Sequence, residues 1–144
     1  MNKQLRNLTV VAFACVPAMS QAWCERHLSI EEEFRASAFV GVGRVISDRE
    51  TPDPPKKKSG AIPDPGHTYS VEVIEVLAGP KRKTIDLFTE YNSGQFPMDI
   101  GKSYLIFARP LFGAHLVSSC GNSGELGQRT VELSSARRLA QSKR

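Results

Sequence analysis

Two cysteines, Cys24 and Cys120, most constrain what this chain of 144 residues can fold into. They lie near the two ends of what remains once an N-terminal export signal is removed, whereas Cys15 lies inside that signal. An even number of cysteines in an oxidising compartment favours a disulfide. The alternative, a metal site, lacks the closely spaced Cys and His partners of zinc sites. A Cys24–Cys120 bridge would close a loop of about 95 residues and stabilise the fold by roughly 4 to 5 kcal/mol.

The first 22 residues have the three-part pattern of a secretory signal peptide. Lys3 and Arg6 form its basic start, and residues 8–16 form an apolar run shorter than the ~20 residues that span a bilayer. Small residues at 20 and 22 predict cleavage after Ala22. We therefore expect residues 1–22 to be removed, leaving a periplasmic or secreted chain with no stable membrane anchor; an uncut anchoring helix is the alternative.

The basic character of the chain is partly a property of that signal. The formal net charge is +4, but Lys3 and Arg6 leave with the signal peptide, so the mature chain is less basic. Both this charge and the expected compartment argue against nucleic acid as a partner.

Hydrophobic periodicity predicts a mainly β domain over residues 23–144. Ser29 and Glu32 form a capping box ahead of a helix over 30–36. A second helix is expected over about 131–141. Five short strands are predicted at 38–47, 67–77, 84–89, 103–109 and 114–119.

Two features of these strands indicate curvature. Gly41 and Gly43 lie inside the first strand, where glycine is typical of a bulge or a sharp bend. In the second strand the apolar phase shifts near Ile74, which predicts either a bulge or a strand that becomes buried on its second face. With all neighbours able to pair antiparallel, a five-stranded Greek-key OB-fold barrel fits the pattern best, and a flattened sandwich is the competing architecture.

Residues 48–67 are rich in proline, glycine and lysine and predict a mobile surface loop. Two basic runs are candidate contact sites, although either could be a solvated loop. They are Lys56, Lys57 and Lys58 in this loop, and Lys81, Arg82 and Lys83 in the turn after the second strand.

The sequence contains none of the common catalytic motifs. No phosphate-binding glycine loop, zinc-protease helix or nucleophile elbow occurs. His27, His67 and His115 are widely spaced, and bridged cysteines cannot act as nucleophiles. We expect a non-enzymatic chain with no metal and no cofactor.

Taken in order, several short motifs resemble the family of netrin modules and tissue inhibitors of metalloproteinases, in its short bacterial exported form. The matching pieces cover most of residues 24 to 121. They are Cys24, Phe39-Val40-Gly41, Tyr69-Ser70-Val71-Glu72-Val73 with Leu77-Ala78-Gly79, Gly101 to Ala108, and Leu116 to Cys120. The resemblance implies a five-stranded OB-fold and a role in binding proteins.

One departure from the family pattern bears on inhibition. The animal inhibitors begin with Cys-x-Cys and chelate the protease zinc through the first cysteine, whereas Cys24 resembles their second cysteine, which bridges to the end of the last strand. The position of the first is Ala22. The mature N-terminus would be Trp23, whose amine and carbonyl could still chelate zinc.

The preferred prediction is an exported, disulfide-stapled binding module that contacts an exported protein or an envelope polymer. The alternative is a metalloprotease inhibitor acting through Trp23 and Cys24. An enzyme with an unrecognised site is the third possibility.

Overall fold

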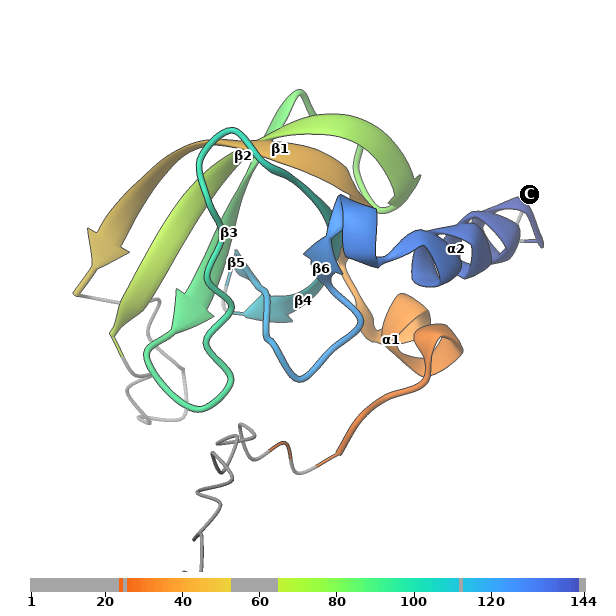
Figure 1. Cartoon of the computed structure of the whole chain (residues 1–144), viewed down its shortest axis with the longest axis horizontal. Coiled ribbons are helices and arrows are strands. Elements are labelled where there is room, and N and C mark those ends of the chain that lie inside the picture. Colours follow the sequence, from red (N-terminus) through yellow and green to blue (C-terminus); the bar gives the residue numbers. More distant parts are fainter. Residues whose placement is uncertain (1–23, 25, 53–64, 112, 143–144) are drawn as a thin grey trace, which may run out of the picture.

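The computed structural model describes residues 24, 26–52, 65–111 and 113–142. A six-stranded sheet and two α-helices make up this part of the chain (Figure 1). The predicted signal peptide, Trp23 and Lys56 to Lys58 lie outside the described residues. The elements are α1 (Ile30–Ala36), β1 (Phe39–Thr51), β2 (Gly66–Ala78), β3 (Thr84–Glu90), β4 (Ser103–Leu111), β5 (Ala114–Leu116), β6 (Gly124–Glu125), the 3-10 helix η1 (Leu126–Gln128) and α2 (Thr130–Ser142).

Five of the strands are hydrogen-bonded in a closed ring. The order is β1-β2-β3-β5-β4, and β4 pairs back onto β1. The pairing of β3 with β5 is parallel and the other pairings in the ring are antiparallel. The expectation that all neighbours pair antiparallel is therefore wrong at one position. The reason is geometric: strand directions cannot alternate all the way round a ring with an odd number of members.

The first strand pairs with β2 along almost its whole length and with β4 along its N-terminal half. Gly43 lies opposite Val73 of β2 and also opposite Tyr104 of β4. The predicted irregularities are present, since the β1–β2 register shifts at three places. At one of them Ile74 has no partner on β1, so of the two alternatives predicted from its apolar phase the bulge is the one observed.

Glycine is required where β1 passes close to β2. A Cβ atom added at Gly41 would lie 2.3 Å from the backbone oxygen of Glu75. The three register shifts and this glycine let the long strand curve from one side of the ring to the other (Figure 1).

Several predicted bounds differ from the observed ones. β1 continues past Ser47 to Thr51 and β2 begins at Gly66, so the two strands take up both ends of the predicted 48–67 loop. β5 ends at Leu116 rather than at residue 119. β6 was not predicted, because two residues are too few for a pattern.

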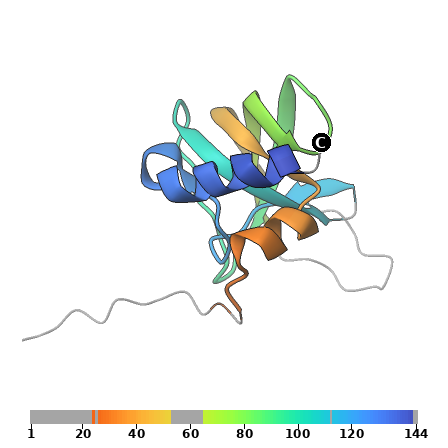
Figure 2. The same ribbon diagram turned by 90° about the vertical axis from the view of Figure 1, so that its right-hand side faces the viewer.

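Two apolar clusters hold the fold together. The larger one fills the inside of the ring and includes Phe39, Leu87 and Ile106. The smaller one lies between β4 and the two helices, where Phe34 of α1 and Ala136 of α2 pack together with Phe107. Both helices lie on one side of the ring (Figures 1 and 2).

The first helix has the predicted bounds and the predicted capping box. The Glu32 amide donates to the Ser29 hydroxyl at 3.2 Å, and the Ser29 amide donates to the Glu32 carboxylate at 2.9 Å. The bond from the Ser29 amide, followed by one from the Ser29 hydroxyl and by the charge of Arg26, lowers the pKa of the Glu32 carboxyl group. Neither helix in the described part of the chain combines the length and the apolar character needed to cross a bilayer.

Candidate functional site

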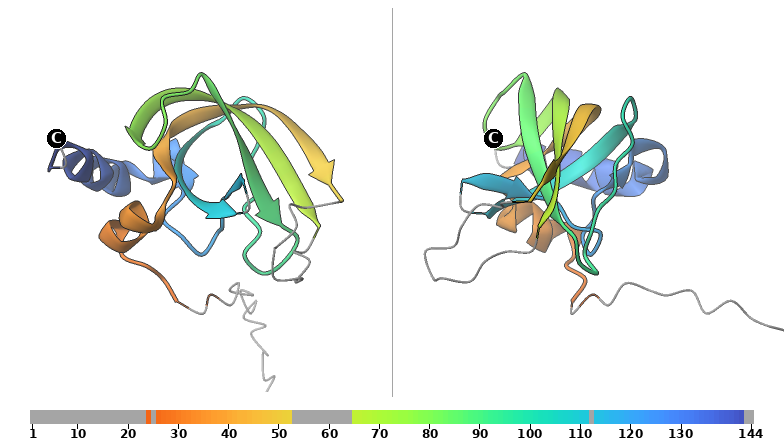
Figure 3. Two further views of the ribbon diagram at one scale, coloured as in Figure 1. Left: turned by 180° about the vertical axis from the view of Figure 1, so that it is seen from behind. Right: turned by 90° about the vertical axis from the view of Figure 1, so that its left-hand side faces the viewer.

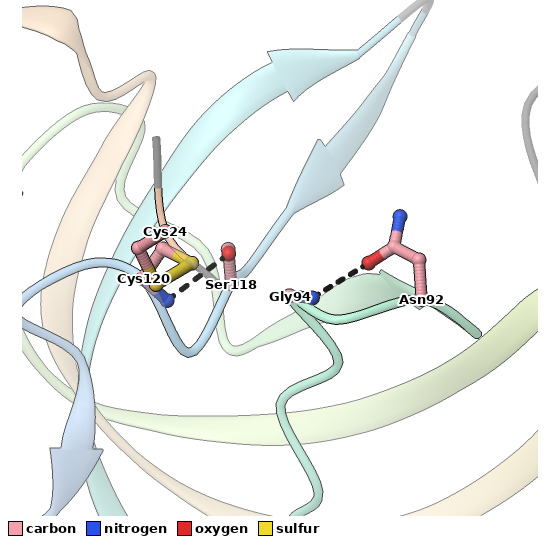
Figure 4. Close-up of a disulfide and its surroundings, with 5 residues drawn as sticks. All are labelled: Cys24, Asn92, Gly94, Ser118 and Cys120. Carbon is pink, nitrogen blue, oxygen red and sulfur yellow. Dashed lines mark hydrogen bonds between the residues drawn. A yellow bond between two sulfur atoms is a disulfide. The ribbon is translucent and has the colours of Figure 1, made fainter. Parts of the chain in front are cut away.

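The predicted disulfide is present and ties the start of the described chain to the segment after β5. The sulfur atoms of Cys24 and Cys120 are 2.07 Å apart and the Cα atoms 5.5 Å apart, across a sequence separation of 96. Figure 4 shows this bridge beside Ser118, whose hydroxyl oxygen accepts a hydrogen bond from the Cys120 amide at 3.2 Å.

A second, non-covalent link fastens the same two segments. The Glu33 side chain of α1 is buried, and one of its carboxylate oxygens accepts from the Asn122 backbone amide at 2.6 Å and from the Asn122 side-chain amide at 2.7 Å. Gly121 makes this approach possible, because a Cβ atom there would lie 2.1 Å from the Glu33 carboxylate. No local signal in the sequence pointed to a contact between Glu33 and Asn122, which are 89 positions apart.

The loop between β3 and β4 closes the site from the other side. The Gly94 amide donates to the Asn92 side-chain oxygen at 2.8 Å, which orders the turn (Figure 4). The Ser119 amide then donates to the Gly94 carbonyl at 3.0 Å. A Cβ atom at Gly94 would lie 2.9 Å from the Ser118 hydroxyl, so glycine allows the two segments to meet.

These segments surround a cavity of about 430 Å³, which we call the disulfide-edge pocket. It falls in the range of volumes of small-ligand and side-chain binding sites. Acidic and basic side chains both line it, which suits a polar ligand or a charged segment of a partner. The lining includes Arg26, Glu33, Glu90, Asn92, Arg109 and Cys120.

The other predicted contact residues lie elsewhere. Lys81, Arg82 and Lys83 are exposed in the turn between β2 and β3, and the Lys83 carbonyl accepts from the Val73 amide at 2.8 Å. The structure therefore separates this basic turn from the disulfide-edge pocket: none of its three residues lines that pocket.

Of the three histidines, His67 is in a hydrogen-bonded row that the sequence did not indicate. Its Nε2 lies 2.8 Å from the Asp48 carboxylate and its Nδ1 lies 2.9 Å from the Tyr91 hydroxyl. Partial desolvation, followed by the charge of Glu50, raises the pKa of Tyr91. This row links β1 and β2 to the residue that follows β3.

The remaining histidines are apart from each other and from His67. His27 is exposed near the disulfide, and His115 is half-buried on β5. Burial, with a contribution from the Arg82 charge, lowers the pKa of His115. Within residues 24, 26–52, 65–111 and 113–142, no group of three or more His, Cys, Asp or Glu side chains is arranged to hold a metal ion.

Comparison with models of known protein families found no match for this chain, and comparison with curated proteins found none either.

Proposed function

We propose that this protein is an exported, non-enzymatic binding module, stapled by the Cys24–Cys120 disulfide, that contacts an exported protein or an envelope polymer. The disulfide supports an oxidising compartment outside the cytoplasm. For the fold, we propose a five-stranded Greek-key OB-fold barrel, which the closed ring of pairings supports; the flattened sandwich is the alternative. The family of netrin modules and tissue inhibitors of metalloproteinases remains our proposal for its relationship.

The observation that carries the binding function is the disulfide-edge pocket. Three separate segments meet there, namely the N-terminal segment, the β3–β4 loop and the residues after β5. The disulfide and the Glu33–Asn122 bonds hold two of these segments in place. A pocket held in this way loses little conformational freedom when a partner binds, which favours affinity.

Charge reversal at the rim of this pocket tests the proposal. Arg109 is exposed and lines the pocket, whereas Arg35 is exposed on α1 and does not line it. We expect Arg109→Glu to reduce recovery of the partner from periplasmic or secreted fractions by about tenfold or more, and Arg35→Glu to leave recovery within about twofold. Quantitative mass spectrometry of material captured by the three proteins measures both effects. Equal recovery by all three, or no reproducible partner, would overturn the proposal.

A second candidate is inhibition of a metalloprotease through the mature N-terminus. It is favoured by the position of Cys24, which follows Trp23 in the chain and is bonded to Cys120 in the lining of the pocket. An α-amine and the adjacent carbonyl could chelate an active-site zinc. One extra residue before Trp23 should then abolish inhibition of a susceptible protease, and unchanged inhibition would reject this mechanism.

A further inference from the structure

The C-terminal half of β1 has an unpaired side. β2 pairs with β1 through to the end of the strand, whereas β4 pairs with it only as far as Arg44. The last backbone bonds on the β4 side are the two that Val45 makes, with Gly101 and Lys102, at 2.8 and 3.0 Å. No described residue pairs on that side with residues 46–51, which we call the β1 edge. Figure 3 (left) shows this end of β1 at the outer margin of the sheet, beside β2.

The β1 edge is open to solvent over five consecutive residues. All of Ile46, Ser47, Asp48, Arg49 and Glu50 are exposed. A strand with one unpaired side leaves alternate amide and carbonyl groups free to bond to another strand. Within the part of the chain that the structure describes, no loop or helix makes a backbone bond to these residues. The β1 edge can therefore accept an extended segment by strand addition.

The two faces of the β1 edge differ in charge. On one face Arg49 is paired with Asp86, with a nitrogen–oxygen distance of 3.1 Å, so its charge is offset. Asp48 and Glu50 lie on the opposite face, because successive side chains of a strand alternate. Asp48 is bonded to His67 at 2.8 Å, whereas Glu50 forms no ion pair with any residue that the structure describes. This face therefore has an excess of acidic groups.

Charge makes a second copy of this chain a poor occupant of the β1 edge. Two such edges related by a two-fold axis would pair antiparallel, and residues directly opposite each other would share a face. In the register centred on Asp48, this carboxylate lies opposite its own copy. In the register centred on Arg49, the two guanidinium groups lie opposite each other and Asp48 lies opposite Glu50. Like charges directly opposite each other are destabilising, and charged side chains commonly protect an edge from self-pairing.

We propose that the β1 edge binds an extended, basic segment of an exported protein, which adds to the sheet as a strand antiparallel to β1. Opposite charges across a strand pair are favourable, so the segment carries two basic residues, separated by one, opposite Asp48 and Glu50. The exposed Ile46 favours an apolar residue beyond them. This inference rests on the proposed binding function and names a kind of partner for it. The surface is distinct from the disulfide-edge pocket, because none of residues 46–51 lines that pocket.

The peptide acetyl-SKTKTVS-amide has this pattern and is titrated into the full mature protein in an NMR experiment. The acidic peptide acetyl-SETETVS-amide is its charge control. We expect the basic peptide to bind and the acidic one not to bind. On binding, amide hydrogen exchange should slow at alternate residues of the β1 edge, because only every second amide of a strand faces an added neighbour. Binding without slower exchange at any of these amides would reject strand addition.

Two further peptides test the backbone bonds themselves. They have the sequence of the basic peptide, with N-methyl groups either on its even-numbered or on its odd-numbered residues, so their charge is the same. Only one of these two sets of amides can face β1. One peptide should therefore bind about tenfold or more weakly, and the other should stay within about threefold of the parent.

Two variants locate the site. Glu50→Lys should weaken binding of the basic peptide by about fivefold or more, because it replaces an attraction across the strand pair with a repulsion. Glu31→Lys makes the same change of charge at an exposed residue of α1 and should alter binding by less than about twofold. Far-UV circular dichroism checks that both variants are folded.

The inference is overturned if the basic peptide does not bind, if the acidic peptide binds equally well, if the two N-methylated peptides bind alike, or if the two variants weaken binding to the same extent. A dimer of the free protein in which the amides of the β1 edge are already protected would assign this edge to a second copy and would also reject the proposal. Failure here can be told apart from failure of the proposed function. If Arg109→Glu still loses its partner while no basic peptide binds, only the strand-addition site is rejected.

Discussion

The bond between Glu33 and Asn122 should contribute substantially to the stability of the fold. Replacing Glu33 with alanine removes two hydrogen bonds to a buried carboxylate, of 2.6 and 2.7 Å, and leaves the Asn122 amide without that acceptor. Hydrogen bonds to charged groups contribute about 1.5 to 3 kcal/mol each, and paired losses add incompletely. We therefore expect Glu33→Ala to lower the free energy of unfolding by about 3 kcal/mol. Glu33→Gln keeps the shape but loses the charge, and should cost about half as much.

Urea-induced unfolding followed by far-UV circular dichroism measures this change, with the disulfide kept oxidised in every variant. Glu31→Ala is the matched control, since Glu31 is exposed in the same turn of α1 and contributes only through the helix dipole, by less than about 1 kcal/mol. A double-mutant cycle with Asn122→Ala should show a coupling of at least about 1 kcal/mol. If Glu33→Ala and Glu31→Ala agree within about 0.5 kcal/mol, the reasoning is refuted.

Three further outcomes follow from the covalent, titratable and steric features of the fold. Replacing Cys24 and Cys120 with serine opens a link across 96 positions and should lower the free energy of unfolding by about 4 to 5 kcal/mol; an unchanged urea midpoint would contradict it. The Ser70 hydroxyl holds the pKa of Asp86 below its usual 3.8, so its stabilisation is present at neutral pH and is lost as the pH falls through the lowered pKa. Asp86→Asn should therefore be less stable at neutral pH and equally stable in strong acid, and a pH-independent difference would count against this. Gly41→Ala places a methyl group 2.3 Å from a backbone oxygen of β2 and should lower the free energy of unfolding by about 1 to 3 kcal/mol. Thermal or urea unfolding measures this, and an unchanged transition would show that β2 can move away at no cost.

Local patterns predicted the elements well. The helix over 30–36 has the expected bounds, because its signals are all within one turn: the Ser29 cap, the Glu32 capping partner and the buried Phe34. The bulge at Ile74 was also readable, since a change of apolar phase in one strand shows directly in the sequence.

Long-range pairing could not be predicted in the same way. The parallel contact of β3 with β5 follows from closure of the ring, which no single strand encodes. The extension of β1 to Thr51 depends on partners across the sheet, such as the Thr68 hydroxyl at 2.6 Å. In the sequence these residues look like the beginning of a proline-rich loop.

The polar residues on the sheet show the same difference between what the sequence predicts and what the tertiary structure decides. The alternation of Thr84 and Asp86 with Ile85 and Leu87 predicts a polar face on β3, but only the register of β2 brings Ser70 to Asp86. Likewise, the sequence predicts that Arg82 lies in an exposed basic turn. That it lies close to His115 depends on the position of β5 in the sheet.

From the chain alone, the disulfide, the curved strands and the two helices could be read, because each depends on residue types or on a period of two or 3.6 residues. Tertiary structure decided which polar groups meet: Glu33 with Asn122, His67 with Asp48, and Arg82 beside His115. Periodicity specifies which face of an element is buried, but it carries no information on which distant segment that face will meet. These long-range contacts are set by strand register and ring closure, which exist only once the whole chain has folded.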